Sequence, residues 1–312
     1  MSERKPTALI LGGGPDAERE VSLRSAALVA AAVRAGGAFD VVERTVGAVA
    51  LADLRAMPGA VVWPVLHGPF GEGGPMQDLL EADGRPYVGC GPGAARLAMD
   101  KIATKMIAAQ SGTLTAEACV LNPRDAACPL PLPVVVKPIF EGSTIGLHVC
   151  RTAEQWRAAH EDAARSGRPC MIERFVPGRE ITVGVLEREP GRLSVLPAIE
   201  IIPADGLYDY EAKYTRNDTR YVVNPPLPPA VLEEASSGAE RLASAIGVRG
   251  LARADFIVAE ADGRPRLLEI NTMPGMTDHS LVPMAAAAAG LDMPRLCTLI
   301  LERALRGAEN AR

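Results

Sequence analysis

Short apolar runs near the start of the chain alternate with segments whose apolar residues recur at helical spacing. Residues 7–11 form one such run, which ends in three glycines at 12–14 and leads into a helical pattern. The order repeats with a strand predicted at 60–66, a glycine-rich loop at 67–74, and a helix that starts with proline. The pattern predicts a doubly wound parallel α/β domain over residues 1–95, with ligands beyond the carboxyl ends of its strands.

Two α+β domains are expected after this first domain, over residues 96–186 and 187–312. A single helix is predicted at 94–110, with Lys101 and Lys105 four residues apart on one side of it. The other expected elements are strands at 134–136, 171–175 and 180–186, helices at 152–165 and 230–246, and two strands flanking 261–263.

Composition excludes several classes of protein. The 33 lysines and arginines against 38 acidic residues give a net charge of −5, which argues against a nucleic-acid partner. The longest apolar run, residues 281–291, is too short for a membrane span of about 20 residues. The first residues lack the apolar region of a signal peptide, so we expect a cytoplasmic protein. Six scattered cysteines without a CxxC pair are expected to be reduced thiols.

Glycine-rich turns after strands raise the question of a dinucleotide site. Neither residues 12–14 nor residues 89–93 fit the GxGxxG spacing, and no GxxxxGK[ST] motif occurs. These glycines serve tight turns at least as well as phosphate binding. The sequence therefore disfavours a nicotinamide-dependent dehydrogenase.

Paired polar side chains mark the two strands around residues 261–263. Arg253 and Asp255 on one strand, and Glu269 and Asn271 on the other, are spaced i, i+2 and so share a face. A symmetric hairpin closed at residues 261–263 places Glu260 opposite Arg264 and Asp255 opposite Glu269. Two facing carboxylates beside an asparagine suit Mg²⁺. A solvated hairpin with ordinary ion pairs fits the spacing equally well.

A second set of polar residues is typical of a nucleotide site. Lys137 ends an apolar strand, and the loop 141–146 after it carries N–H and hydroxyl donors that could close over phosphates. In the 171–180 segment, Glu173 and Glu180 could accept hydrogen bonds from amino and ribose hydroxyl groups. Each feature alone is also compatible with a simple turn.

Two further residues have both a functional and a structural interpretation. His67 follows a strand and is flanked by glycines, a favourable place for a catalytic or binding histidine. Ser280 precedes a predicted helix at Leu281, so it is expected to cap that helix, where N–H groups could also bind a carboxylate.

Eight segments together resemble the D-alanine–D-alanine ligases of the ATP-grasp superfamily, in the family's order and over nearly the whole chain. They are GGGPDAEREVSL (12–23), HGPFGEGG (67–74), VGCGPGAARLAMDKIATK (88–105), VVKPIFEGSTIGL (135–147), ERFVPGREITV (173–183), YDYEAKYT (208–215), RADF (253–256) and LLEINTMPGMTDHSLVP (267–283).

The resemblance implies an ATP-grasp fold in which the two α+β domains clamp ATP, and it assigns roles to particular residues. It implies an ATP site formed by Lys101, Lys137, Glu141, Gly142, Ser143, Thr144, Glu173, Phe175, Val176, Glu180 and Lys213. It implies substrate contacts from Glu18, His67, Arg253, Gly275, Ser280 and Leu281, and catalytic roles for Glu18, Ser143, Tyr214 and Arg253. It implies two Mg²⁺ ions, with Mn²⁺ as a substitute, held by Asp255, Glu269 and Asn271.

The implied activity is ATP-dependent joining of two D-alanines through a D-alanyl phosphate, for peptidoglycan precursor synthesis, by a cytoplasmic homodimer. Tyr214 resembles the tyrosine of members that form the dipeptide, which favours D-alanine as second substrate. The alternatives are a related ligase that uses D-lactate or D-serine, and a binding protein with an inactive site. One departure from the family is Gly73, where the HGxxGEDG motif has aspartate, and this affects the rigidity of the loop.

Overall fold

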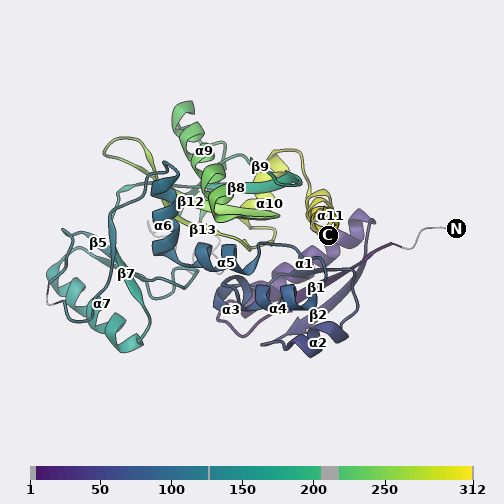
Figure 1. Cartoon of the computed structure of the whole chain (residues 1–312). Helices are drawn as coiled ribbons and strands as arrows, with labels where there is room; N and C mark the ends of the chain where they lie inside the picture. The colour runs from purple at the N-terminus through teal and green to yellow at the C-terminus, as the bar shows by residue number, and fades with distance from the viewer. Residues whose placement is uncertain (1–4, 126, 205–217, 311–312) are drawn as a thin grey trace.

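Three β-sheets organise the chain, seen here in a computed structural model that describes residues 5–125, 127–204 and 218–310. A three-stranded sheet is formed near the N-terminus, a four-stranded sheet by the middle of the chain, and a six-stranded sheet by later segments. Figure 1 shows the six-stranded sheet between the other two. The α/β fold class is confirmed, whereas the domain boundaries at 95/96 and 186/187 stay predictions.

The first sheet has the expected parallel, doubly wound order β2-β1-β3. Its strands are β1 (Thr7–Gly13), β2 (Asp40–Val46) and β3 (Val61–Pro64), and its helices are α1 (Arg19–Gly36), α2 (Leu51–Ala56), α3 (Gly68–Glu72) and α4 (Pro75–Asp83). The segment 67–74, expected to be a loop, contains the short helix α3. Glu18 and His67 follow the turns after β1 and β3, so both residues lie beyond the carboxyl ends of these parallel strands.

The prediction of a continuous helix at 94–110 is wrong. Two helices, α5 (Pro92–Met99) and α6 (Lys101–Gln110), are separated at Asp100, whose backbone is extended. The Asp100 carboxylate accepts hydrogen bonds from the N–H groups of Ile102, at 2.9 Å, and Ala103, at 3.0 Å. A side-chain cap of this kind starts a new helix within an unbroken apolar pattern. The break places Lys101 in the first turn of α6.

The four-stranded sheet is antiparallel, with the order β4-β7-β5-β6. Its strands are β4 (Ala118–Val120), β5 (Val134–Pro138), β6 (His148–Cys150) and β7 (Cys170–Arg174), and helix α7 (Ala153–Ser166) packs on it. Trp156 of α7 and Val136 of β5 belong to a core cluster to which, among the described residues, neither of the other two sheets contributes. Its lysine and glutamate side chains therefore project from a unit with its own packing.

The six-stranded sheet has the order β11-β10-β8-β12-β13, with β9 paired to β8. Its strands are β8 (Gly178–Glu189), β9 (Arg192–Val195), β10 (Ile199–Ile202), β11 (Arg220–Val223), β12 (Leu251–Ala259) and β13 (Pro265–Asn271), and helices α9 (Pro229–Ile246), α10 (Leu281–Ala288) and α11 (Met293–Asn310) accompany them.

The β12–β13 hairpin has the expected pairing at one end only. Asp255 lies opposite Glu269, as predicted, but near the turn the register is shifted by one residue, so Val258 faces Pro265. A β-bulge between Asp255 and Phe256 corrects the shift. The Glu260–Arg264 pairing is therefore wrong, and the bulge restores the carboxylate pair.

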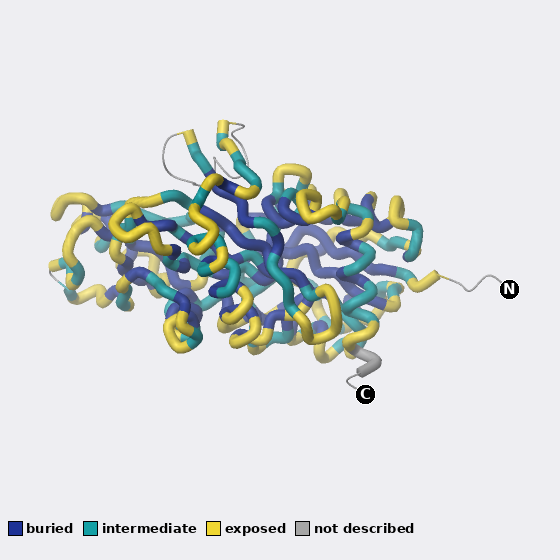
Figure 2. Tube along the Cα trace, turned by 90° about the horizontal axis from the view of Figure 1, so that it is seen from above, coloured by how far each residue is buried: buried dark blue, intermediate teal, exposed yellow. Residues whose placement is uncertain are grey.

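One apolar core joins the first and last thirds of the chain. Val29 of α1 and Trp63 of β3 lie in the same cluster as Leu186 of β8 and Leu296 of α11. Figure 2 shows the buried strands running through the interior, with exposed residues on turns and outer helices. Within the described ranges no single helix is long and apolar enough to cross a membrane; α10 and α11 reach that length only together, bent by 103°.

Candidate active site

A cavity of about 400 Å³ lies between the four-stranded and six-stranded sheets. The four-stranded sheet and its loops contribute Lys137, Thr144 and Glu173, and the six-stranded sheet contributes Asp255 and Glu269. The other predicted ATP-site residues that line it are Lys101, Glu141, Gly142, Phe175, Val176 and Glu180. We call it the large cavity. Lys213 and Tyr214 lie outside the described residues.

A second cavity of about 60 Å³, the small cavity, adjoins the large one. It is lined by every residue of the predicted substrate site: Glu18, His67, Arg253, Gly275, Ser280 and Leu281. Gly142 and Glu269 line both cavities. A group held in the small cavity can therefore meet a group held in the large cavity beside Glu269.

The Asp255 carboxylate is fixed by three neighbours. Thr182 Oγ1 donates to Asp255 Oδ1 at 2.7 Å, and Asn271 Nδ2 donates to Oδ2 at 3.1 Å. The guanidinium of Arg253 binds both oxygens, with Nη2 2.8 Å from Oδ2. Across the hairpin, Glu269 Oε2 lies 3.5 Å from Lys101 Nζ. Each facing carboxylate is thus balanced by a cation, which removes their mutual repulsion.

The chemistry of this donor set fits a divalent cation. Within the described ranges no three His, Cys, Asp or Glu side chains gather as a metal cluster, and the set here is two carboxylates with one amide. Rotation of the Asn271 amide exchanges its nitrogen for its oxygen, since the two are assigned from hydrogen bonding. Asp255, Glu269 and Asn271 could then present oxygen atoms only, the ligands that Mg²⁺ prefers.

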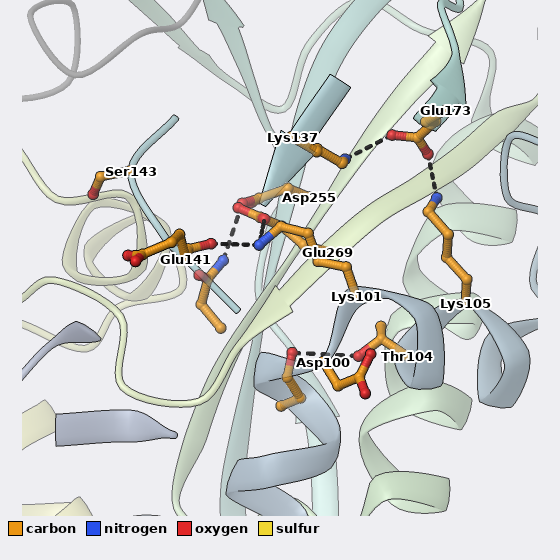
Figure 3. A network of polar contacts seen from close by, with 12 residues as sticks. Asp100, Lys101, Thr104, Lys105, Lys137, Glu141, Ser143, Glu173, Asp255 and Glu269 are labelled. Carbon is orange, nitrogen blue, oxygen red and sulfur yellow. Dashed lines mark hydrogen bonds and ion pairs between the residues drawn. The ribbon is translucent and has the colours of Figure 1, made fainter. Parts of the chain in front are cut away.

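Glu173 lies between two lysine ammonium groups at the other end of the large cavity (Figure 3). Lys137 Nζ lies 2.6 Å from Glu173 Oε2, and Lys105 of α6 forms an ion pair with Oε1. Burial raises the pKa of Glu173, but the charges of Lys137 and Lys105 outweigh it, so that pKa lies below its usual value. Burial lowers the pKa of Lys105, and the attraction of Glu173 opposes this only in part.

Lys105 was not among the predicted site residues. Its spacing of four residues from Lys101 was the available signal, because residues i and i+4 of a helix share a face. The sequence could not show that Glu173, distant along the chain, would lie beside it.

The loop between β5 and β6 folds over the junction of the two cavities. Ser143 and Thr144 adopt left-handed backbone conformations, with φ of 51° and 65°, which costs free energy in residues other than glycine. Ser143 Oγ donates a hydrogen bond to Glu18 Oε1, and Lys101 Nζ donates one to the carbonyl of Glu141. Ser143 and Glu18, to which the family resemblance assigns catalytic roles, are therefore in contact.

His67 lines the small cavity and has one unprotonated ring nitrogen. Its Nδ1 lies 3.0 Å from the carbonyl of Met273, and since a carbonyl only accepts, Nδ1 carries the proton. Burial lowers the pKa of His67, which favours the neutral ring. Nε2 has no hydrogen-bond partner among the described residues and is thus available as an acceptor.

Glu72 lines the small cavity but was missed by the sequence predictions, although it lies in the quoted motif HGPFGEGG. Burial, followed by the nearby charge of Glu18, raises the pKa of Glu72 to about 8. Gly73 follows it, and a Cβ there would lie 2.4 Å from the carbonyl oxygen of Pro69. The aspartate that the family motif has at this position would therefore clash with this backbone.

Ser280 precedes α10 as expected, but its side chain does not cap the helix. Ser280 Oγ accepts from the N–H of Thr277 at 2.9 Å and lies 2.8 Å from Thr277 Oγ1. This local turn holds the hydroxyl beside Gly275, where an added Cβ would be 2.9 Å from Ser280 Oγ. The cap prediction is wrong because the hydroxyl has this competing partner.

Comparison with known sequences finds close relatives over almost the whole chain. A family model described as the D-Ala–D-Ala ligase C-terminus matches residues 106–302. A D-alanine–D-alanine ligase of Anaeromyxobacter dehalogenans (strain 2CP-C) is 44% identical over 95% of this chain and 96% of its own. The chain belongs to the D-alanine–D-alanine ligase family. Another member, from Bordetella parapertussis, is 43% identical over 97% of this chain and 96% of its own.

Solved structures of D-alanine–D-alanine ligases have the same fold. The ligase of Bacillus anthracis complexed with ATP has a TM-score of 0.83 at 28% identity, and the match covers 100% of both chains. The Enterococcus faecalis D-Ala:D-Ser ligase VanG has a TM-score of 0.80 at 22% identity, covering 96% of this chain and 100% of its own. The fold alone therefore does not distinguish D-alanine from D-serine as second substrate.

Proposed function

We propose that this protein joins two D-alanines into D-alanyl-D-alanine, converting ATP to ADP and phosphate, for peptidoglycan precursor synthesis. Family membership at 44% identity supports the reaction class. The observation that carries the assignment to this site is the meeting of the two cavities at Glu269 and Gly142. ATP occupies the large cavity and the amino acids occupy the small one.

A carboxylate resists attack by an amine, so it must first be activated. In the first step, a carboxylate oxygen of the first D-alanine bonds to the γ-phosphorus of ATP, the bond to the ADP oxygen breaks, and D-alanyl phosphate forms. Lys101 and Lys137 bind the phosphates, and their charges favour the transfer. Glu18 and the acceptor nitrogen of His67 bind the ammonium group of this D-alanine.

Asp255, Glu269 and Asn271 would hold two Mg²⁺ ions, or Mn²⁺ in their place. When bound, these ions neutralise the charge of the transferring phosphoryl group. Lys101 and Arg253 pair with the same carboxylates, so these cations would share or exchange the carboxylate oxygens with a bound divalent cation. Arg253 also lines the small cavity, where its guanidinium can contact the substrate.

In the second step the amine of the second D-alanine attacks the acyl carbon, phosphate leaves with the oxygen it received, and the proton lost by the amine leaves with the phosphate. Arg253 and the N–H of Gly275 stabilise the oxyanion, a contribution of about 2.7 to 4 kcal/mol for a donor of this type. Ser280 and Leu281 bind the second D-alanine. Ser143, Glu18 and Tyr214 hold the loop 141–147 over the site, which limits hydrolysis of the acyl phosphate.

The proposal is tested by phosphate release from ATP with D-alanine alone and then with D-lactate or D-serine added as the second substrate. We expect rapid release with D-alanine alone and the dipeptide as product. A product that contains D-lactate or D-serine in preference would assign the protein to that branch of the family.

We also propose a cytoplasmic homodimer, as the family resemblance implies. Light scattering on the purified chain tests the assembly, with twice the 32.8 kDa chain mass expected. Cell fractionation tests the location.

A further inference from the structure

Two lysines contact one carboxylate at Glu173, and they differ in what else they contact. The side chains of Lys105, Lys137 and Glu173 are only 7%, 9% and 3% exposed. Lys137 lines the large cavity, whereas Lys105 does not. Lys105 therefore contacts Glu173 from outside the lining of the large cavity, and Figure 3 shows the two lysines approaching Glu173 from different directions.

Lys105 is held independently of the nucleotide. It projects from α6, one turn after Lys101, and its Nζ donates to the carbonyl of Leu267 on β13 at 3.3 Å. The helix packs against β13, the strand that carries Glu269. The ammonium of Lys105 thus stays beside Glu173 when Lys137 turns toward a ligand.

We infer that Lys105 is a positioning residue that holds the Glu173 carboxylate as a hydrogen-bond acceptor and so makes the site select a purine with a 6-amino group over one with a 6-oxo group. The inference rests on the proposed function, in which Glu173 accepts from the adenine amino group.

The physical reason is the cost of burying a charge. A carboxylate buried with a single cation that must also serve the nucleotide would take up a proton and become a donor. A donor repels the 6-amino group and attracts a 6-oxo group. A second lysine that never meets the ligand keeps Glu173 an acceptor, and a mismatched purine then leaves buried polar groups unpaired.

The test compares the dissociation constants of ADP and IDP, which differ at the 6-position, by calorimetry on the full chain. For Lys105→Met we expect the preference for ADP to fall about tenfold, and for Lys105→Arg we expect it to stay near that of wild type. Lys137→Met serves as a contrast, because loss of a phosphate contact weakens ADP and IDP together. An unchanged ADP preference in Lys105→Met would overturn the inference.

A double variant covers the case in which Lys105→Met does not fold. Lys105→Met combined with Glu173→Gln removes both charges of the Lys105–Glu173 ion pair together, and we expect its ADP preference to equal that of Glu173→Gln alone. A further fall in the double variant would show that Lys105 acts by another route. Because binding needs no turnover, the outcome is separate from whether D-alanine stimulates phosphate release.

Discussion

The carboxylates at the two ends of the large cavity differ in their exposure and in how they are paired with cations. At the hairpin end, Asp255 and Glu269 face each other across two strands, and the Glu269 side chain is 21% exposed. At the opposite end, Glu173 is 3% exposed and each of its oxygens is paired with a lysine. The first end has cations that a metal ion can replace, and the second has a carboxylate that stays fixed.

The comparison indicates that the chemical step and the recognition of the nucleotide depend on different carboxylates. An exchangeable pair of carboxylates suits a site whose charge changes during a reaction, because its cations can be redistributed. A fixed carboxylate suits recognition of a group that does not react. We therefore expect substitutions at the hairpin end to lower kcat, and substitutions at the Glu173 end to raise the KM for ATP.

The largest expected effect follows from Asp255→Ala. Loss of one oxygen ligand and of the Arg253 partner should lower turnover about 1,000-fold or more, measured as phosphate release with D-alanine. Asp53→Ala, at an exposed position of α2, is the control and should retain activity, since Asp53 lines neither cavity. Wild-type turnover in Asp255→Ala would refute the metal assignment.

Glu173→Gln should give the opposite kinetic pattern. The amide keeps the shape but lacks the charge that orders Lys105 and Lys137, so we expect KM for ATP to rise about tenfold while kcat changes less than about threefold. Steady-state kinetics with saturating D-alanine measure both constants. A large fall in kcat at unchanged KM would show that the two ends do not divide their roles as described.

Glu72 is a third carboxylate, with no ion pair to any described residue, and it should reveal itself in the pH dependence of stability. Because its folded pKa, about 8, lies above the ordinary value of 4.5, the unfolded chain loses this proton first. The free energy of unfolding should fall as pH rises from about 4.5 to about 8, by at most about 1.4 kcal/mol per pH unit.

Glu72→Gln should flatten this slope, measured by urea unfolding without Mg²⁺ across that pH range. Exposed Glu20 provides the control, and Glu20→Gln should keep the wild-type slope. Equal slopes in Glu72→Gln and wild type would contradict the raised pKa.

The smallest effect is expected next to Glu72, at Gly73. An added Cβ would lie 2.4 Å from the Pro69 carbonyl oxygen, so Gly73→Ala should lower the free energy of unfolding by about 1 to 3 kcal/mol. Gly93→Ala is the matched control, since nothing lies within 4 Å of a Cβ there. Urea unfolding that gives both variants the same stability would mean that the loop relaxes freely.

The sequence predicted the parts of this site that depend on local spacing. The i, i+2 pairs of the hairpin specified that Arg253 and Asp255 share a face, whatever the register. The strand ends that carry Lys137 and His67 were likewise predicted from apolar runs and glycines.

The features that the sequence did not predict depend on contacts between distant segments or on competition among polar groups. The β-bulge at Asp255 has no single-residue signal, and the break at Asp100 depends on a side chain that replaces helical hydrogen bonds. Ser280 had two possible partners and bonds to Thr277. The role of Lys105 depends on its contact with Glu173, a residue distant along the chain, which periodicity does not reveal.

The most direct test of the proposed reaction follows one oxygen atom. D-Alanine labelled with ¹⁸O in its carboxylate is incubated with ATP, Mg²⁺ and the protein, and the phosphate is examined by mass spectrometry. Activation through D-alanyl phosphate predicts that each dipeptide formed is accompanied by one phosphate that carries one ¹⁸O atom. Dipeptide formed with unlabelled phosphate would contradict the account.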